Sequence, residues 1–167
     1  GTWNEVPYEA LFAAMQGAAD ICYIAEDLGI LNERTENARD ALGFPGMKIL
    51  SFAFDSGEQN PYLPHFYTPN TVVYGGTHDN EPLLAYFENA PDWVRDFAAA
   101  YLGLHEKSPA VISEAVIRAG LNSCADLAIF LMQDYMGKGR EARINTPSVL
   151  GGNWTYRFRA QDFSDAL

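Results

Sequence analysis

Basic residues are scarce in this sequence of 167 residues, which has 11 lysines and arginines against 22 aspartates and glutamates. The resulting formal net charge of −11 creates a negative field that repels polyphosphates and anionic lipid headgroups. We therefore expect neither nucleic acid nor a membrane surface as a partner. Neutral ligands that bind through hydrogen bonds and ring stacking, such as sugars, are not affected by this field.

Cysteine is nearly absent as well. Cys22 and Cys124 lie far apart and show no paired spacing such as CxxC, so neither a zinc ribbon nor a disulfide framework is indicated. We expect both to be reduced, buried thiols in a cytoplasmic protein.

Long apolar runs are missing too. No stretch approaches the ~18 apolar residues that a membrane helix needs, and the first residues lack the basic and then apolar pattern of a signal peptide. The sequence begins at Gly1 without an initiator methionine. We therefore expect a processed, tagged or partial chain.

The sequence is rich in residues that build a core. Hydrophobic residues make up 48% and aromatic residues 13% of the chain, which excludes a disordered tail. A chain of this length fits one domain with a sizeable core. We therefore treat residues 1–167 as one globular unit.

Helical and apolar segments alternate along the chain. Helices are predicted over residues 8–19, 32–42, 80–88, 91–102 and 108–119, and buried strands over residues 21–25, 47–54, 71–76 and 127–132. Residues 55–70 contain three prolines and are expected to form a loop, and residues 140–167 a loop with a short strand. Short apolar strands between helices indicate an α/β fold with a parallel sheet. Four such units could form a small open sheet or half of an eight-stranded barrel, and the strand pattern does not decide between them.

Polar clusters follow each predicted strand directly: Glu26-Asp27, Asp55, residues 77–80 and Gln133-Asp134. In a parallel barrel, all these strand ends point to one rim, where the clusters would meet in one cleft. The alternative is that each cluster only caps the helix that follows. Four clusters in succession favour a site.

Two of these clusters suit chemistry on a sugar. Partial burial at a strand end would raise the pKa of Glu26 and make it a general acid, while strand alternation sends Asp27 to the opposite face. Asp79 and His78 could hold vicinal hydroxyls or stabilise positive charge on a sugar ring. The alternative for His78 is a structural histidine between the helix cap and the core.

A metal site is not predicted. His65, His78, Asp79 and Glu81 share one region, but their spacing matches no known ligand signature. Aromatic residues are dense around the same region and again near the end, where Trp154 follows two glycines. Aromatic rings suit the faces of sugars, although many of these rings could instead anchor loops or fill the core.

Five separate motifs resemble the amylomaltases, the 4-α-glucanotransferases of glycoside hydrolase family 77. They are IAEDLG at 24–29, FPGMKILSFAFD at 44–55, NPYLPH at 60–65, THDN at 77–80 and the stretch from ARINTP to GGNW at 142–154. The motifs occur in order and span nearly the whole chain.

The resemblance implies roles for individual residues. Glu26 would be the general acid/base, and Asp79 the carboxylate that holds sugar hydroxyls and stabilises the transition state. His78 would hydrogen-bond the same ring, and Asp55 and Asn145 would touch bound glucan. No organic cofactor and no metal are implied.

The family's nucleophile is an aspartate at the end of the strand before the acid/base strand, and no matching motif precedes residue 21. The resemblance thus implies that residues 1–167 are the C-terminal half of a (β/α)8 TIM barrel, roughly strands five to eight. The expected partners are α-1,4-glucans, maltooligosaccharides and the N-terminal half of the same enzyme, and this chain alone should be inactive.

The implied reaction is a retaining double displacement in which a glucan 4-hydroxyl replaces water as the acceptor. Two alternatives remain open. One is a hydrolytic relative of the α-amylases, and the other is a half barrel that binds glucan without catalysis.

Overall fold

A computed structural model describes residues 6–29 and 31–163 of the chain. Its centre is a three-stranded parallel sheet formed by β1 (Gly46–Ile49), β2 (Thr71–Tyr74) and β3 (Leu127–Ile129), in the order β1-β2-β3. Gly46 pairs with Thr71, and Val72 pairs with Leu127. The predicted α/β fold with a parallel sheet is therefore confirmed.

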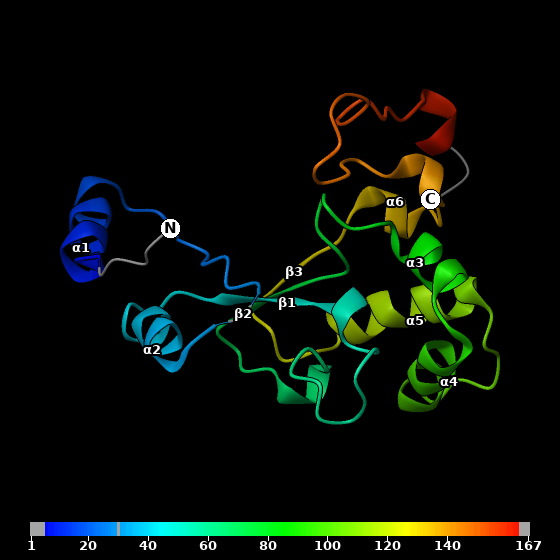
Figure 1. Cartoon of the computed structure of the whole chain (residues 1–167), viewed down its shortest axis with the longest axis horizontal. Helices are drawn as coiled ribbons and strands as arrows, with labels where there is room; N and C mark the ends of the chain where they lie inside the picture. The colour runs from blue at the N-terminus through cyan, green and yellow to red at the C-terminus, as the bar shows by residue number, and fades with distance from the viewer. Residues whose placement is uncertain (1–5, 30, 164–167) are drawn as a thin grey trace.

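In Figure 1, α1 and α2 lie to the left of the sheet and α3 to α6 to its right. The α-helices are α1 (Tyr8–Ala18), α2 (Glu33–Ala41), α3 (Leu83–Asn89), α4 (Asp92–Tyr101), α5 (Pro109–Leu121) and α6 (Met132–Tyr135). Short 3-10 helices span Leu50–Phe52, Pro64–Phe66, Arg140–Ala142 and Ala160–Phe163. The five predicted helices are all present, with shifted ends. The Asn32 side chain caps α2 by accepting the backbone N–H of Thr35 at 2.9 Å, as expected from the sequence.

The first predicted strand, residues 21–25, is wrong. This segment runs beside β1, where Ala25 donates its backbone N–H to the Pro45 carbonyl at 2.9 Å. The next acceptor is not a carbonyl but the Asp27 carboxylate, which accepts the Met47 N–H at 2.7 Å. Because a side chain takes the place of the backbone, no regular ladder forms. Ile21 and Ile24 are exposed rather than buried.

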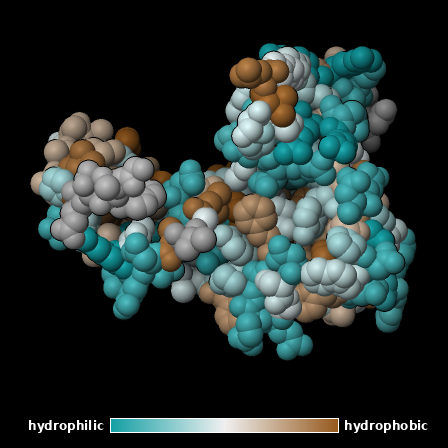
Figure 2. Space-filling view, in the orientation of Figure 1, coloured by the Kyte–Doolittle hydropathy of each residue, from teal (hydrophilic) through white to brown (hydrophobic). Residues whose placement is uncertain are grey.

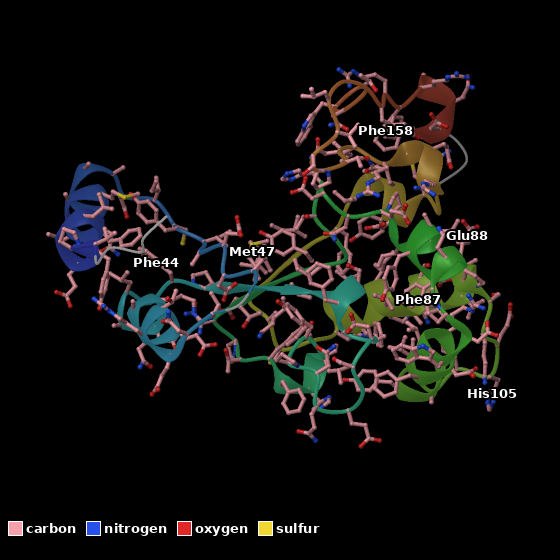
Figure 3. The ribbon with its side chains drawn as sticks, in the orientation of Figure 1. Phe44, Met47, Phe87, Glu88, His105 and Phe158 are labelled. Carbon is pink, nitrogen blue, oxygen red and sulfur yellow. The ribbon has the colours of Figure 1, made fainter. Side chains whose placement is uncertain are left out.

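Only the first part of the apolar run of residues 47–54 forms the predicted strand. The strand ends at Ile49, and the chain then turns into the 3-10 helix Leu50–Phe52. Leu50 and Phe54 are nonetheless fully buried, because they enter the core between the sheet and α3, α4 and α5. Phe87 of α3, labelled in Figure 3, belongs to the same core.

Burial was predicted wrongly at two further places, and one further strand is absent from the described residues. Leu127 and Ile129 are exposed because β3 lies at the edge of the sheet and these alternate residues face away from the core. Cys22 and Cys124 are free thiols, as expected, but both are exposed. Residues 140–163 form two 3-10 helices and loops without the expected short strand, and residues 164–167 lie outside the described part.

A buried carboxylate joins two helices, α6 and α3. Asp134 of α6 is 6% exposed, and its Oδ1 accepts the backbone N–H of Leu83 at the start of α3 at 2.8 Å. Its Oδ2 has no hydrogen-bond partner among the described residues. Burial raises the pKa of Asp134 from 3.8 to about 6.

This carboxylate should make stability depend on pH. The folded state holds the Asp134 proton more tightly than the unfolded state, so its contribution is full below about pH 4 and is lost as the pH rises to about 6. The loss is at most about 3 kcal/mol. We expect Asp134→Asn, which keeps the acceptor for Leu83, to flatten the pH dependence of urea unfolding between about pH 4 and 6. Asp126→Asn, at an exposed position, is the control. Parallel curves for wild type and Asp134→Asn would contradict the assignment.

Candidate functional site

A cavity of about 540 Å³ opens where β2 and β3 end. This volume is in the range of sites for small ligands. The residues that line it are Glu26, Leu28, Met47, Tyr74, Gly76, Thr77, His78, Asp79, Ile129, Leu131, Ile144 and Trp154. Tyr74 and Ile129 are the last residues of β2 and β3, so the cavity lies at the carboxyl ends of these parallel strands. Met47, one of the lining residues, is labelled in Figure 3.

A tight turn after β2 presents the candidate residues. Asn80 accepts hydrogen bonds from both the backbone N–H and the hydroxyl of Thr77, each at 2.8 Å, and donates its own N–H to the Thr77 carbonyl at 3.1 Å. These bonds close the turn around His78 and Asp79, whose side chains are left about half exposed, at 49% and 45%. Thr77 and Asn80 therefore fix the backbone of the turn, while the His78 ring and the Asp79 carboxylate stay accessible to a ligand.

Asn145 joins the turn from a distant part of the chain. Its side-chain amide donates to Asp79 Oδ1 at 2.5 Å, and its backbone N–H donates to the His78 carbonyl at 3.1 Å. His78 Nε2 lies 3.3 Å from the same Asp79 oxygen. With Oδ1 held in this way, the orientation of the Asp79 carboxylate is fixed.

Glu26 lies in the same cavity as His78 and Asp79, so the structure brings together three of the residues selected from the sequence. Its setting differs from the expected one, because it follows an extended segment rather than a strand and its side chain is exposed. Asp27 turns away to an ion pair with Arg39, in agreement with the expected opposite facing of the two neighbours. Glu26 is therefore not partly buried by the described residues, contrary to expectation.

Two of the predicted clusters do not join the cavity lining. Asp55 is exposed and accepts a hydrogen bond from the Asn60 amide at 3.2 Å, in the loop after the 3-10 helix Leu50–Phe52. Gln133 and Asp134 are buried, and their side chains bind the Ala142 carbonyl and the Leu83 N–H. This last cluster lies within α6 and does not cap a helix that follows it, because Asp134 binds the start of the preceding helix α3.

Arg143 is a residue that the sequence analysis missed. Its guanidinium donates to the Asp79 carbonyl at 2.8 Å and to the Asn145 carbonyl at 2.9 Å, and it pairs with Glu81 at 3.3 Å. One side chain thus ties together the two segments that carry Asp79 and Asn145. The sequence offered one signal, an arginine two residues before Asn145 in the ARINTP motif. Its hydrogen-bond partners could not be predicted, because they depend on how the chain folds.

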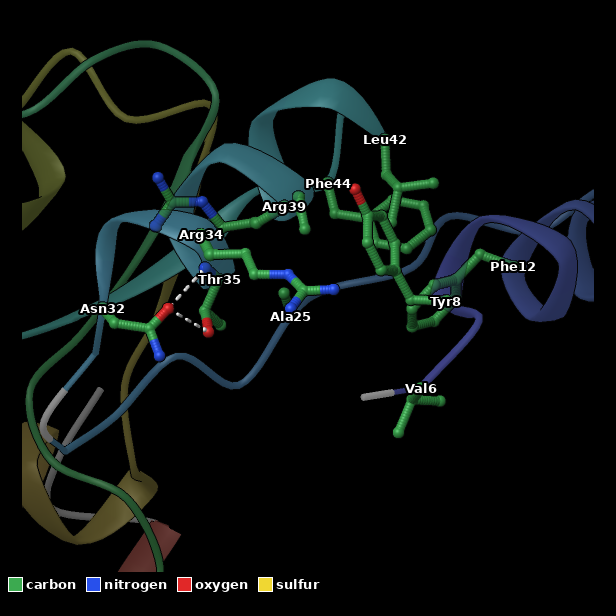
Figure 4. A pocket seen from close by; sticks show the side chains of 11 residues that line it. Val6, Tyr8, Phe12, Ala25, Asn32, Arg34, Thr35, Arg39, Leu42 and Phe44 are labelled. Carbon is green, nitrogen blue, oxygen red and sulfur yellow. Dashed lines mark hydrogen bonds between the residues drawn. The ribbon is translucent and has the colours of Figure 1, made fainter. Parts of the chain in front are cut away.

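A second cavity of about 540 Å³ lies between α1 and α2 (Figure 4). Phe12, Leu42 and Phe44 supply apolar walls. Asn32 and Thr35 bond to each other at the start of α2, and Arg39 is paired with Asp27. None of the described residues that line this cavity has an acidic side chain, in contrast to the cavity at the end of the sheet.

No group of three or more His, Cys, Asp or Glu side chains suited to a metal ion occurs within residues 6–29 and 31–163. No helix among the same residues is long and apolar enough to cross a membrane.

Known proteins match the chain over nearly its whole length. The sequence model of the family described as 4-alpha-glucanotransferase matches residues 1–162. A 4-alpha-glucanotransferase of Thermus thermophilus is 39% identical over 98% of this chain, and one of Clostridium butyricum is 41% identical over all of it. An amylomaltase structure from Streptococcus agalactiae in complex with acarbose superimposes over 99% of the chain, with a TM-score of 0.89 and 37% identity.

The matched region is only part of each of these proteins. It makes up 34% of the two curated relatives and 33% of the Streptococcus agalactiae chain. The chain therefore spans about a third of the length of the proteins that it resembles.

Proposed function

Because the chain belongs to glycoside hydrolase family 77, the 4-alpha-glucanotransferases, we propose that it supplies the acid/base part of a site that transfers α-1,4-glucan segments to the 4-hydroxyl of an acceptor glucan. The observation that carries this proposal is the shared cavity at the strand ends, where Glu26 lies with His78 and Asp79. A carboxyl group beside a carboxylate and an imidazole matches the needs of glycosidic bond exchange.

In the proposed reaction, Glu26 protonates the departing glycosidic oxygen and later takes the proton from the acceptor hydroxyl. Asp79, oriented by Asn145, accepts hydrogen bonds from hydroxyls of the reacting ring and stabilises its developing positive charge. His78 binds the same ring from the side. Asp55 lies outside the cavity lining, so its proposed contact is with a more distant part of a long glucan.

We further propose that residues 1–167 form the C-terminal half of a (β/α)8 barrel. The parallel strands with covering helices fit this topology. So do the exposed Leu127 and Ile129 on β3 and the exposed Ile21 and Ile24 beside β1, because the other strands of a closed barrel would cover these side chains. Figure 2 shows apolar atoms at the surface over the middle of the molecule.

The partner in this proposal is a polypeptide that completes the barrel and carries the nucleophilic carboxylate. Its support is the length of the relatives, about three times that of the region they share with this chain. The complex with acarbose of the Streptococcus agalactiae amylomaltase supports a glucan-like ligand. The chemistry needs no cofactor, and we place the protein in the cytoplasm.

A chimera tests the proposed function. The matched third of the Thermus thermophilus relative is replaced by residues 1–167, and the product is incubated with maltotriose. We expect glucose together with maltooligosaccharides longer than the substrate, at a constant number of reducing ends, because transfer conserves glycosidic bonds. A hydrolase would raise the number of reducing ends. A correctly folded chimera that binds maltotriose without converting it would favour the alternative of a binding half barrel.

A further inference from the structure

Trp154 has an unusual backbone conformation. Its φ of +62° lies in the left-handed region, which only one other non-glycine residue, Ser148, occupies within residues 6–29 and 31–163. For a bulky side chain such a φ is a clear outlier. Glycines occupy the nearby positions with positive φ, Gly151 and Gly152, whereas position 154 carries a tryptophan. Strain of this kind persists where the surrounding structure imposes it, and it concentrates at functional sites.

The backbone around Trp154 is held on both sides. Its N–H donates to the Ile144 carbonyl at 2.7 Å, and its own carbonyl accepts from Arg157 at 2.9 Å. Asn153 closes the preceding loop through the backbone of Thr146, which donates to its side chain at 2.9 Å. The same chain segment carries Asn145, so the loop and the Asp79 contact form one unit.

Core packing does not explain this arrangement, because Trp154 is 57% exposed. Its ring lies in the wall of the cavity with Glu26 and Asp79, and its centroid is 5.0 Å from that of the His78 ring. A large, flat, exposed ring is thus held at the edge of a cavity that is also lined by two carboxylates and an imidazole. The carboxylates accept hydrogen bonds from hydroxyls and repel anions, so they suit a neutral ligand with many hydroxyls, and the flat ring suits one with an apolar face.

We infer that Trp154 is the platform on which one pyranose ring of the bound glucan stacks, next to the ring held by His78 and Asp79. This inference rests on the proposed function and adds a specificity-determining residue to it. The hydroxyl edges of the sugar face Glu26 and Asp79, while its C–H face covers the indole. Stacking of this kind adds to affinity beyond the area that is buried.

The test measures binding of maltoheptaose to the complete chain of 167 residues. Trp3 and Trp93 are replaced by phenylalanine, so that Trp154 is the only tryptophan and its fluorescence reports on the site directly. We expect a saturable change in emission with maltoheptaose. An equal concentration of inositol, a single polyhydroxylated ring that is not a glucan, should give no change. In the natural sequence, Trp154→Ala should weaken binding about tenfold, as measured by calorimetry. Trp154→Phe should retain most of the affinity.

Two variants separate a platform from a structural role. Trp93→Ala is the matched control, because Trp93 is exposed to a similar degree, 54%, on α4 outside the cavity. It should bind as the wild type does. Trp154→Gly also removes the ring but suits the left-handed backbone, so its Tm should equal or exceed that of the wild type while binding falls as in Trp154→Ala.

The outcomes are distinct. Equal affinity of the wild type and Trp154→Ala would overturn the inference and leave the proposed function standing. A Trp154→Gly variant with a Tm as low as that of Trp154→Ala, and below that of the wild type, would show that the ring holds the loop, which also overturns it. Failure of maltoheptaose to bind both to the folded wild-type chain and to its chimera with the Thermus thermophilus relative, at any concentration tested, would remove the proposed glucan site itself.

Discussion

Glu26→Gln is expected to lower the rate of maltotriose disproportionation by about 10²- to 10⁴-fold in the chimera with the Thermus thermophilus relative, because this is the usual contribution of a general acid or base. An amide has the shape of the carboxyl group but cannot donate a proton to the leaving oxygen. The KM for maltotriose should change far less than kcat, since the role proposed for Glu26 is at the reacting bond rather than at the distant sugar rings.

The loss should depend on the leaving group, which a purely structural role would not produce. An aryl maltooligoside that releases a weakly basic phenol needs little help from an acid. Formation of the glycosyl-enzyme from this substrate should therefore be far less impaired in Glu26→Gln than the reaction of maltotriose. Single-turnover kinetics with both substrates give the comparison.

Glu88→Gln is the matched control. Glu88 is an exposed residue of α3 outside the cavity lining, labelled in Figure 3. This variant should keep the full rate. Disproportionation of maltotriose by Glu26→Gln at the rate of the wild type would remove Glu26 from the acid/base role.

The candidate site could be found in the sequence because its residues stand in compact motifs. His78 and Asp79 lie in the turn that follows β2, and Glu26 follows an extended segment that lies beside β1. What could not be predicted is the contact between Asn145 and Asp79, because it joins segments far apart in the chain and depends on the path of the loops between them. The same holds for Arg143.

Errors in the fold prediction have a common physical cause. An apolar run can be buried in a strand, in a core turn or against another part of the protein, and hydrophobicity alone does not separate these cases. Leu50 and Phe54 are in the core without being in a strand, whereas Ile21 and Ile24 are apolar and exposed. The second pair fits a surface that further polypeptide covers, as proposed above.

Residues 1–167 on their own are expected to show no transferase activity. A retaining mechanism needs a nucleophilic carboxylate roughly 5 Å from the acid. The acidic residues in the described cavity lining are Glu26 and Asp79, and the Oδ1 of Asp79 is already bound by Asn145. Asp79 is therefore suited to holding sugar hydroxyls rather than to attacking the anomeric carbon. Maltotriose incubated with the purified chain should stay intact.

The isolated chain should also associate with itself or with a completing fragment. Leu127 and Ile129 are 45% and 38% exposed along the β3 edge, and Ile21 and Ile24 are 59% and 42% exposed beside β1. Open sheet edges with apolar side chains are templates for pairing with another chain. We expect sedimentation velocity to show oligomers that dissociate when the N-terminal part of the Thermus thermophilus relative is added.

Activity should appear only on mixing the chain with that N-terminal part, because the two then contribute the acid and the nucleophile to one site. The control is the same mixture made with the Glu26→Gln chain, which should assemble to the same extent and remain inactive. This pair of mixtures separates failure to assemble from failure of the chemistry. Glucose released from maltotriose by the chain alone, at a purity confirmed by mass spectrometry, would show that the nucleophile lies within residues 1–167 and would contradict the division of the site between two parts.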